Sequence, residues 1–210
     1  MCGIAGFWDV AHRHSGDDGL TALRRMTLSI CHRGPDDEGY FHDEKAGLAL
    51  GFRRLSILDL SREGHQPMSS ASGRYVMVFN GEVYNHARLR PELKAAGFGF
   101  RGHSDTEVML AAIEHWGLEG AIERFIGMFA FALWDRQDRM LTLVRDRLGI
   151  KPLYYGWVGS RFVFASELKA ITALTGFNNP IDRNVLCLLL RHSYIPAPYS
   201  IYQNIRKLMP

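Results

Sequence analysis

The sequence predicts an α+β fold in which antiparallel β-sheets are covered by helices. Predicted strands outnumber predicted helices, and the helices stand in groups between runs of strands. The regular alternation of strand, helix and strand that builds a doubly wound parallel sheet is missing. The 210 residues are enough for one large domain with a substantial core.

Apolar periodicity predicts the individual elements along the chain. Strands are expected where apolar residues alternate or run continuously, and helices where they recur every three or four residues. In chain order, these segments are a strand over residues 4–9, a helix over 20–30, strands over 40–42, 47–52 and 75–79, helices over 85–96 and 106–116, strands over 128–134, 140–144, 153–155 and 162–165, and helices over 167–174 and 184–192.

Polar residues mark the starts of two of these helices. Ser15, Asp17 and Asp18 offer N-caps for the first helix. Ser104 and Glu107 have the spacing of a capping box and open the helix over residues 106–116.

The composition excludes several classes of function. The net charge of +3, without a block of Lys or Arg, does not favour nucleic-acid binding. The 3 cysteines form neither a disulfide framework nor a zinc-binding spacing, so we expect no metal site. No apolar run reaches the ~20 residues of a membrane span, and a signal peptide is not evident. We therefore expect a cytoplasmic protein that does not bind membranes.

Cys2 directly follows the initiator Met1 and precedes Gly3, so loss of Met1 makes it the N-terminal residue. It then carries a thiol and a free α-amine, with ordinary pKa values of about 8.5 and 7.7–8.0, so the amine can accept the thiol proton. This is the pairing of an N-terminal nucleophile. A lone cysteine is more often a small buried apolar residue. The nucleophile hypothesis therefore requires an oxyanion hole and a substrate clamp elsewhere in the chain.

Three segments offer these parts, and each also has a simpler interpretation. The apolar strand Tyr75–Phe79 is expected to stop at Asn80-Gly81-Glu82, where an amide and backbone N–H groups would offer donors to an oxyanion. Asn-Gly is more often a hairpin turn. Arg53-Arg54 is either an anion clamp or a solvated strand end. Asp105 lies in a first helical turn, where the helix dipole alone favours an acidic residue.

Eight short motifs occur together and in order. They are Cys2-Gly3-Ile4, Arg33-Gly34-Pro35-Asp36, Arg54-Leu55-Ser56-Ile57, Gly64-His65-Gln66-Pro67-Met68, Asn80-Gly81-Glu82, Ser104-Asp105-Thr106-Glu107, Gly127-Met128-Phe129-Ala130-Phe131-Ala132 and the run from Arg145 to Tyr155. With them the chain closely resembles the glutaminase half of glutamine-hydrolysing asparagine synthetases, which are class II glutamine amidotransferases. The resemblance extends from Cys2 to the last residues.

The resemblance implies a fold and a catalytic apparatus. The fold would be the N-terminal nucleophile hydrolase sandwich, with four layers in the order αββα and two antiparallel sheets face to face. Cys2 would be the nucleophile, and its freed α-amine would carry the proton. Asn80 and the Gly81 N–H would form the oxyanion hole. Arg53, next to the matching Arg54, is assigned to the surface or to support of the site.

The resemblance also implies how glutamine would be bound. Arg54 would grip the α-carboxylate, as a guanidinium does in bidentate fashion. Glu82 and Asp105 would face the α-ammonium group. Leu55 and Ile57 would contribute contacts to the same pocket.

The implied reaction is ping-pong hydrolysis of the glutamine amide. The thiolate would attack the carboxamide and release ammonia, and water would free glutamate from the γ-glutamyl thioester. In the family, a synthetase domain follows and uses Mg-ATP to activate the acceptor carboxylate. Its pyrophosphate loop is absent here, as is a P-loop, so we expect no cofactor in this chain.

We expect residues 1–176 to form the glutaminase domain and residues 177–210 the connector and the start of a truncated synthetase domain. The expected partners are glutamine and the synthetase domain of the same full-length chain, and a homodimer is left open. For the whole protein, the leading hypothesis is amidation of aspartate to asparagine. One alternative is another acceptor, such as a sugar acid in surface-polysaccharide synthesis. A second alternative is an interaction or storage protein that retains the fold without the chemistry.

Overall fold

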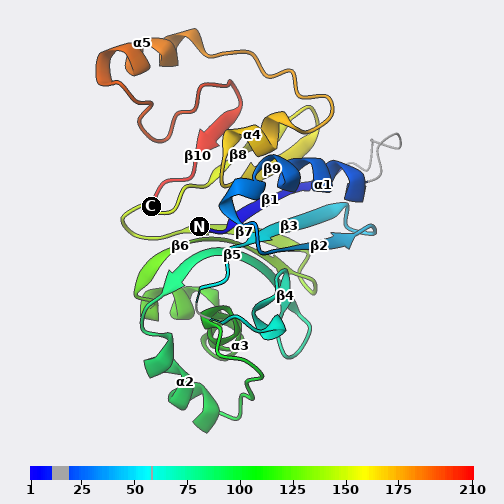
Figure 1. The fold of residues 1–210 in the computed structure, drawn as a ribbon, viewed down its shortest axis with the longest axis vertical. Coiled ribbons are helices and arrows are strands. Elements are labelled where there is room, and N and C mark those ends of the chain that lie inside the picture. The colour runs from blue at the N-terminus through cyan, green and yellow to red at the C-terminus, as the bar shows by residue number, and fades with distance from the viewer. Residues whose placement is uncertain (11–18, 58) are drawn as a thin grey trace.

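The computed structural model describes residues 1–10, 19–57 and 59–210, and Figure 1 shows their arrangement. The expected N-caps Ser15, Asp17 and Asp18 lie outside these residues. In chain order, the elements are β1 (Gly3–Trp8), α1 (Gly19–Ser29), a 3₁₀ turn over Cys31–Arg33, β2 (Asp37–Asp43), β3 (Leu48–Arg54), a 3₁₀ turn over Arg62–Gly64, β4 (Met68–Ser69), β5 (Tyr75–Val83), α2 (His86–Ala95), α3 (Asp105–Arg124), β6 (Gly127–Asp135), β7 (Met140–Arg145), β8 (Tyr154–Val158), β9 (Arg161–Ala165), α4 (Leu168–Thr172), α5 (Arg183–His192) and β10 (Ile205–Lys207).

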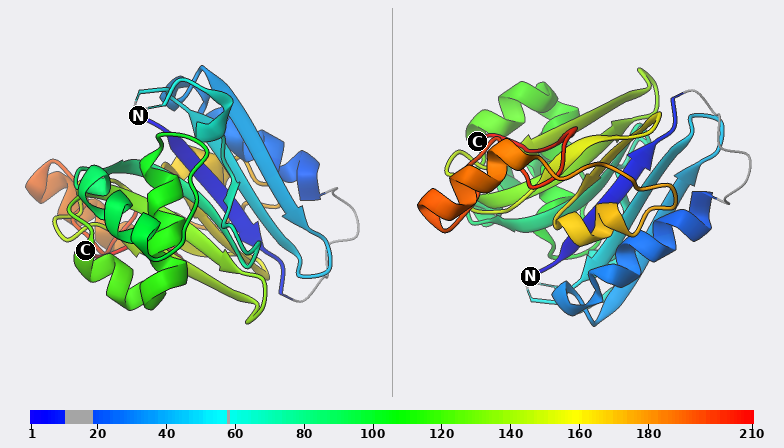
Figure 2. Two further views of the ribbon diagram at one scale, coloured as in Figure 1. Left: turned by 90° about the horizontal axis from the view of Figure 1, so that it is seen from below. Right: turned by 90° about the horizontal axis from the view of Figure 1, so that it is seen from above.

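The strands form two antiparallel sheets that are stacked face to face. The six-stranded sheet has the order β10-β8-β9-β1-β3-β2, and the four-stranded sheet has the order β4-β5-β6-β7. Helices α1 and α4 cover the outer face of the first sheet, and α2 and α3 cover that of the second (Figure 1). The views from below and above show the two helical layers on opposite sides of the sheets (Figure 2). The predicted αββα sandwich of antiparallel sheets is confirmed.

Alternation along the strands divides the apolar residues among three cores, because successive side chains of a strand point to opposite faces. In β1, Ile4 faces the other sheet while Ala5 and Phe7 face the helices. In β5, Val78 faces inward, whereas Phe79 packs under α3. The inner core, between the sheets, consists of Ile4, Ala46, Leu48, Leu50, Phe52, Val76, Val78, Ala130, Ala132, Trp134, Leu153 and Phe164.

The same alternation brings three distant polar residues to the interior. Cys2 immediately precedes β1. It lies two residues before Ile4, so its side chain points to the same inner face and packs against the inner core. Arg54 ends the inward row of β3, and Asn80 follows Val78 on the inward face of β5. Because the pairing of β1 with β3 matches Gly3 with Arg53, Cys2 and Arg54 lie at the same end of the sandwich.

The predicted end of β5 is wrong. The strand does not stop at Asn80-Gly81-Glu82 but continues to Val83, and each of these residues has a partner in β6. Asn80 pairs with Ala130 and Gly81 with Phe129, so the Asn-Gly turn does not form. The local turn signal is overridden by the neighbouring strand.

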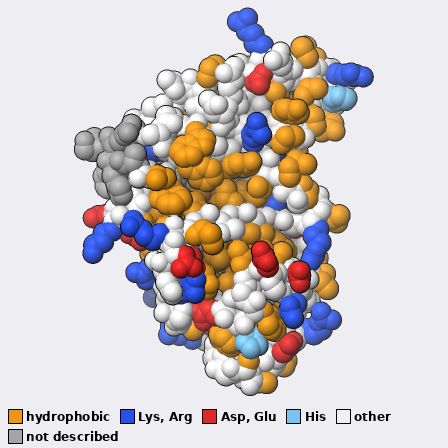
Figure 3. Space-filling model, turned by 180° about the vertical axis from the view of Figure 1, so that it is seen from behind, with side chains coloured by type: hydrophobic (Ala, Val, Ile, Leu, Met, Phe, Trp, Pro, Cys, Tyr) orange, Lys and Arg blue, Asp and Glu red, His pale blue; other side chains and the backbone are white. Residues whose placement is uncertain are grey.

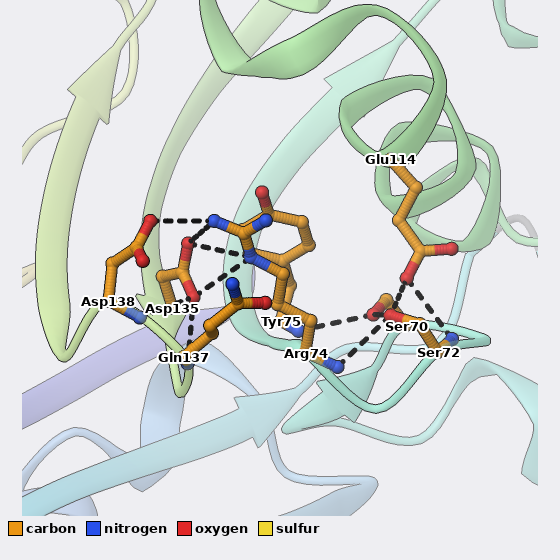
Figure 4. A network of polar contacts seen from close by, with 8 residues as sticks. All are labelled: Ser70, Ser72, Arg74, Tyr75, Glu114, Asp135, Gln137 and Asp138. Carbon is orange, nitrogen blue, oxygen red and sulfur yellow. Dashed lines mark hydrogen bonds and ion pairs between the residues drawn. The ribbon is translucent and has the colours of Figure 1, made fainter.

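The register of β5 and β6 is held by a polar network at the end of the strand pair opposite Asn80 (Figure 4). Arg74 pairs with Asp135 at 2.6 Å and with Asp138 at 2.7 Å. Glu114 of α3 accepts hydrogen bonds from Ser72, whose backbone nitrogen lies 3.1 Å from Oε1. A slip of one residue would turn Asn80 to the opposite face of the sheet.

Helix α3 begins one residue earlier than predicted, at Asp105. It is kinked at Gly117, whose φ of 73° is not helical. The predicted end at Trp116 coincides with this break. Of the predicted capping box, Ser104 accepts the Thr106 N–H at 3.0 Å. Glu107 does not bind the N-cap nitrogen but accepts N–H groups of the preceding loop, at 2.6 and 3.2 Å.

The last segment of the chain contributes a strand to the first sheet. β10 pairs with β8, and Ile205 is 2% exposed within the core under α4. The expected domain boundary after residue 176 stays a prediction.

Hydrophobic side chains gather across the middle of one face of the molecule (Figure 3). Leu141, Leu143 and Tyr155 pack against the inner core and remain partly exposed, so this core reaches the surface beside β7 and β8.

Candidate active site

A pocket of about 170 Å³ opens at the end of the sandwich where β1 begins. Its walls include every residue that the sequence analysis assigned to a site: Cys2, Arg54, Leu55, Ile57, Asn80, Gly81, Glu82 and Asp105. Its remaining wall residues are Met1, Phe52, Asp59, Gly64, Gln66, Phe79, Ser104, Thr106, Met128 and Lys151. The predicted residues, drawn from four separate segments, therefore meet in one place.

The Cys2 thiol is held beside the backbone of Leu55. Its Sγ lies 3.6 Å from the Leu55 carbonyl oxygen and 3.4 Å from the Leu55 nitrogen. Arg33 Nε donates to the Cys2 carbonyl oxygen at 2.9 Å and fixes the backbone. Burial raises the pKa of the thiol, although the Leu55 N–H, the chain's α-amine and Arg54 oppose the shift. The thiol is therefore protonated at neutral pH and needs a proton acceptor to react.

Asn80 presents an unpaired donor to the interior. The residue is 1% exposed, and its Nδ2 makes no hydrogen bond with any described residue. Buried polar groups are paired in the great majority of cases, so an unpaired amide in a pocket wall indicates a site for a ligand.

The backbone N–H of Gly81 is a second free donor. In an antiparallel pair the N–H groups of alternate residues point to opposite edges. Tyr84 donates to Ile126 of the β6 side at 2.8 Å, so the odd-numbered residues of β5 point their N–H groups away from β6.

The neighbours of Gly81 on that edge are both satisfied by side chains. Phe79 N donates to Gln66 Oε1 at 2.7 Å, and Val83 N donates to Asp105 Oδ2 at 2.9 Å. The Gly81 N–H lies between them in the pocket wall, points away from β6 and makes no hydrogen bond to another described residue. A side chain at Gly81 would collide with the chain of β6, since its Cβ would lie 2.6 Å from the Phe129 Cα. The pocket thus holds two free donors on adjacent residues.

Arg54 is buried and oriented by main-chain oxygens. It is 7% exposed, and its Nη1 donates to the Ser61 carbonyl at 2.9 Å while Nη2 donates to the Asp59 carbonyl. Arg53 points the other way, since it is the next residue of the same strand, and pairs with Glu38 outside the pocket. The assignment of Arg54 rather than Arg53 to the pocket agrees with this geometry.

The acidic side of the pocket consists of Asp105 and Glu82. Asp105 is 5% exposed at the start of α3 and accepts the Val83 N–H. Burial raises the pKa of Asp105, against the influence of that N–H and of His86. Glu82 is partly exposed on the inward side of β5. A guanidinium on one wall and carboxylates on another can bind the two ends of a zwitterion.

Sequence reasoning missed three wall residues that make specific contacts: Gln66, Asp59 and Lys151. Gln66 lies in one of the quoted motifs, so its position could have been singled out. Its hydrogen bonds with Phe79 and Thr106, however, depend on the fold. Lys151 is 5% exposed, and its Nζ donates to Met1 Sδ at 3.4 Å. Asp59 lies in a loop and shows no signal of its own in the sequence.

Within the described residues, no group of three or more His, Cys, Asp or Glu side chains is placed to hold a metal ion. The described helices are also too short or too polar to cross a membrane.

Face-to-face antiparallel sheets between helical layers, with a thiol leading into a central strand, define the class of N-terminal nucleophile hydrolases. Within this class, the chain belongs to the glutamine amidotransferase domain family, whose model matches residues 1–210.

Comparisons with individual proteins agree with this family. Asparagine synthetase [glutamine-hydrolyzing] 1 of Bacillus subtilis is 40% identical over 210 residues, which are 100% of this chain and 32% of that protein. A putative asparagine synthetase [glutamine-hydrolyzing] of Mycobacterium bovis is 39% identical over 222 residues, covering 99% of this chain and 34% of the relative. The chain thus spans about a third of the length of the curated relatives it matches.

The fold is shared with a solved structure of glutamine phosphoribosylpyrophosphate amidotransferase from B. subtilis. The TM-score is 0.68 at 22% identity, over 82% of this chain and 43% of that chain.

Proposed function

We propose that this chain hydrolyses the side-chain amide of glutamine to glutamate and ammonia, with Cys2 as the nucleophile. The observation that carries the proposal is the pair of free donors, Asn80 Nδ2 and the Gly81 N–H, in the pocket that holds the thiol. Preorganised donors of this kind stabilise the oxyanion of acyl transfer.

The chemistry begins after Met1 has been removed. The Cys2 α-amine accepts the thiol proton, and the thiolate attacks the amide carbon of glutamine. The negative charge on the amide oxygen is then stabilised by Asn80 and Gly81. Collapse of the intermediate breaks the carbon–nitrogen bond, and the α-ammonium group returns its proton so that ammonia leaves. Water attacks the γ-glutamyl thioester by the same route, which releases glutamate and regenerates the thiol.

The proposed substrate contacts follow the charges of the pocket. Arg54 binds the α-carboxylate of glutamine, and Asp105 with Glu82 binds the α-ammonium group. Leu55 lies against the nucleophile, and Ile57, which is 68% exposed, lies at the open part of the wall. These contacts hold the amide near Cys2 without taking part in bond changes.

For the whole protein, we propose that the ammonia serves a synthetase domain that activates aspartate with Mg-ATP and forms asparagine. Support comes from the names of the longer relatives and from the third of their length that this chain spans. These names favour aspartate over a sugar acid as the acceptor. The apolar face of Figure 3 is the surface on which we place the contact between the two parts.

The test is glutamate release from glutamine by the purified chain and by Cys2→Ala, with Cys187→Ala as the matched control. Cys187 is an exposed cysteine outside the pocket. We expect activity in the wild type and the control and none in Cys2→Ala. A glutamine-analogue alkylator should add its mass to Cys2 in the wild type. Residual turnover by pure Cys2→Ala would refute the nucleophile assignment.

A further inference from the structure

Asp59 contacts both sides of the pocket and carries no role in the reaction described above. Its backbone carbonyl oxygen accepts a hydrogen bond from Arg54 Nη2, and the Ser61 carbonyl accepts one from Nη1 at 2.9 Å. The turn that contains Asp59 and Ser61 therefore sets the direction of the Arg54 guanidinium.

The Asp59 carboxylate keeps that turn in shape. Its Oδ1 accepts hydrogen bonds from the Ser61 nitrogen at 2.8 Å and from Ser61 Oγ at 2.6 Å. These bonds from Ser61 and the one from the His103 N–H hold the pKa of Asp59 at about 2, and the Arg54 charge acts in the same direction. The side chain is thus ionised at neutral pH.

The second carboxylate oxygen reaches the other wall. Oδ2 accepts the backbone N–H of His103 at 2.9 Å, and His103 lies two residues before Asp105. The approach is close, because a Cβ at Gly102 would lie 2.7 Å from the same oxygen. Ser104 then caps α3, so the path from Asp59 to Asp105 runs through a fixed backbone.

We propose that Asp59 is a positioning residue that fixes the distance between Arg54 and Asp105 and thereby makes the pocket selective for amides that carry both an α-carboxylate and an α-ammonium group. The proposal rests on the proposed function, since it assumes that Arg54 and Asp105 bind the two ends of glutamine. Asp59 does not touch the reacting atoms. It acts through its carbonyl on Arg54 and through its carboxylate on the segment that leads to Asp105.

The test compares three amides as substrates of the full chain. They are glutamine, 4-carbamoylbutanoate, which lacks the α-amine, and 4-aminobutanamide, which lacks the α-carboxylate. The variants are Asp59→Asn, which keeps the size of the side chain, Asp59→Ala and Ser61→Ala. Asp182→Asn is the matched control, because Asp182 also accepts the N–H of the second residue after it, at 3.0 Å, but lies outside the pocket.

We expect Asp59→Asn to raise the KM for glutamine about tenfold, the effect of losing one charge-assisted hydrogen bond, with kcat changed by less than about threefold. The preference for glutamine over each analogue, measured as a ratio of kcat/KM, should shrink. Ser61→Ala should show the same pattern to a smaller extent, and it carries the test if Asp59→Ala does not fold. The control should match the wild type.

Two results would overturn the proposal. One is an unchanged KM and an unchanged preference in folded Asp59→Asn. The other is a loss of kcat alone with the preference for glutamine intact, which would mean a merely structural role. If the wild type is active and the variants give either of these results, only the role of Asp59 is overturned. A folded, processed wild type that releases no glutamate overturns the proposed function as well.

Discussion

Gln66 takes the place of a strand beside Phe79. Its Oε1 accepts the Phe79 N–H at 2.7 Å, and its Nε2 lies 3.2 Å from Thr106 Oγ1 of α3. The pairing of β4 with β5 stops at Met68, so this side chain continues the edge where the neighbouring strand has ended. The next N–H on that edge, at Gly81, is left for a ligand.

Replacing Gln66 by Met is therefore expected to weaken both the strand edge and catalysis. The buried Phe79 N–H would lose its acceptor, which costs about 1–3 kcal/mol of unfolding free energy. Since Asn80 and Gly81 follow directly, kcat should fall by about tenfold with a smaller change in KM. Urea unfolding and steady-state kinetics measure the two effects. Gln137→Met, in the exposed turn between β6 and β7, is the control. Lost stability with normal kcat would mean that Gln66 does not position the oxyanion hole.

Asn80→Ala should lower kcat by ~10²–10³, the usual effect of one oxyanion donor, and change KM much less. Stability should not fall with it, because the Asn80 amide nitrogen makes no hydrogen bond that could be lost. Burial of an unpaired amide costs free energy in the wild type, and its removal relieves this cost. A fall in the urea midpoint that matched the loss of activity would show that Asn80 is structural.

Arg54→Ala should have the opposite kinetic pattern. Loss of the guanidinium that grips the carboxylate should raise the KM for glutamine by about 10- to 100-fold, as for a lost bond to a charged group. Arg53→Ala is the matched control, since the neighbouring side chain points away from the pocket and pairs with Glu38. A kcat effect for Arg54→Ala together with a KM effect for Asn80→Ala would reverse the proposed roles.

Much of the fold could be predicted from apolar periodicity. The apolar runs of β1, β3 and β5 are visible in the sequence and correctly indicate strands with a core on each face. The missing alternation of strand, helix and strand correctly indicates antiparallel sheets. The end of β5 could not be predicted in this way. Asn80-Gly81 is a strong local turn signal, and only the pairing with Ala130 and Phe129 of β6 shows that the strand continues.

The site could be predicted in part. Motifs point to Cys2, Arg54, Asn80 and Asp105, which line one pocket, whereas their residue types alone leave simpler interpretations open. Arg53 and Arg54 are successive residues of β3 and point to opposite faces of the sheet, which is the physical reason for choosing Arg54. Gln66 and Asp59 were missed because their importance lies in contacts with segments far away in the chain, Phe79 and Thr106 for one and His103 for the other.

Chains that retain Met1 should be inactive. Met1 forms part of the pocket wall, and its sulfur contacts Lys151 Nζ at 3.4 Å. It also converts the Cys2 α-amine into an amide, which cannot accept the thiol proton. Intact mass after treatment with a glutamine-analogue alkylator separates the two forms. We expect the added mass on the processed chain, and equal labelling of the Met1-bearing chain would contradict a role for the α-amine.

Glutamine hydrolysis should depend on the ionisation of Asp105. Burial raises the pKa of this carboxyl above its ordinary 3.8. Only the anion attracts an α-ammonium group, so kcat/KM for glutamine should fall as pH drops through this raised value.

Folding stability depends on the pH in the opposite sense to kcat/KM. A folded-state pKa above the unfolded value means that the native chain binds the proton more tightly, so the stability that Asp105 contributes is present at low pH. This contribution is lost as pH rises through the folded pKa. Asp105→Asn keeps an acceptor for the Val83 N–H without the buried charge. It should bind glutamine weakly at every pH, lose the acid limb due to Asp105, and unfold at a higher urea concentration than the wild type near neutral pH.

Profiles of kcat/KM from about pH 4 to 8, with urea unfolding at both ends, measure these effects. Glu82→Gln is the necessary comparison, because Glu82 is the other carboxylate that faces the proposed ammonium site. An acid limb that moves in Glu82→Gln and stays in Asp105→Asn would assign the titration to Glu82. Because Asp105 is the more deeply buried of the two carboxylates and burial raises its pKa, we expect the limb to disappear with Asp105.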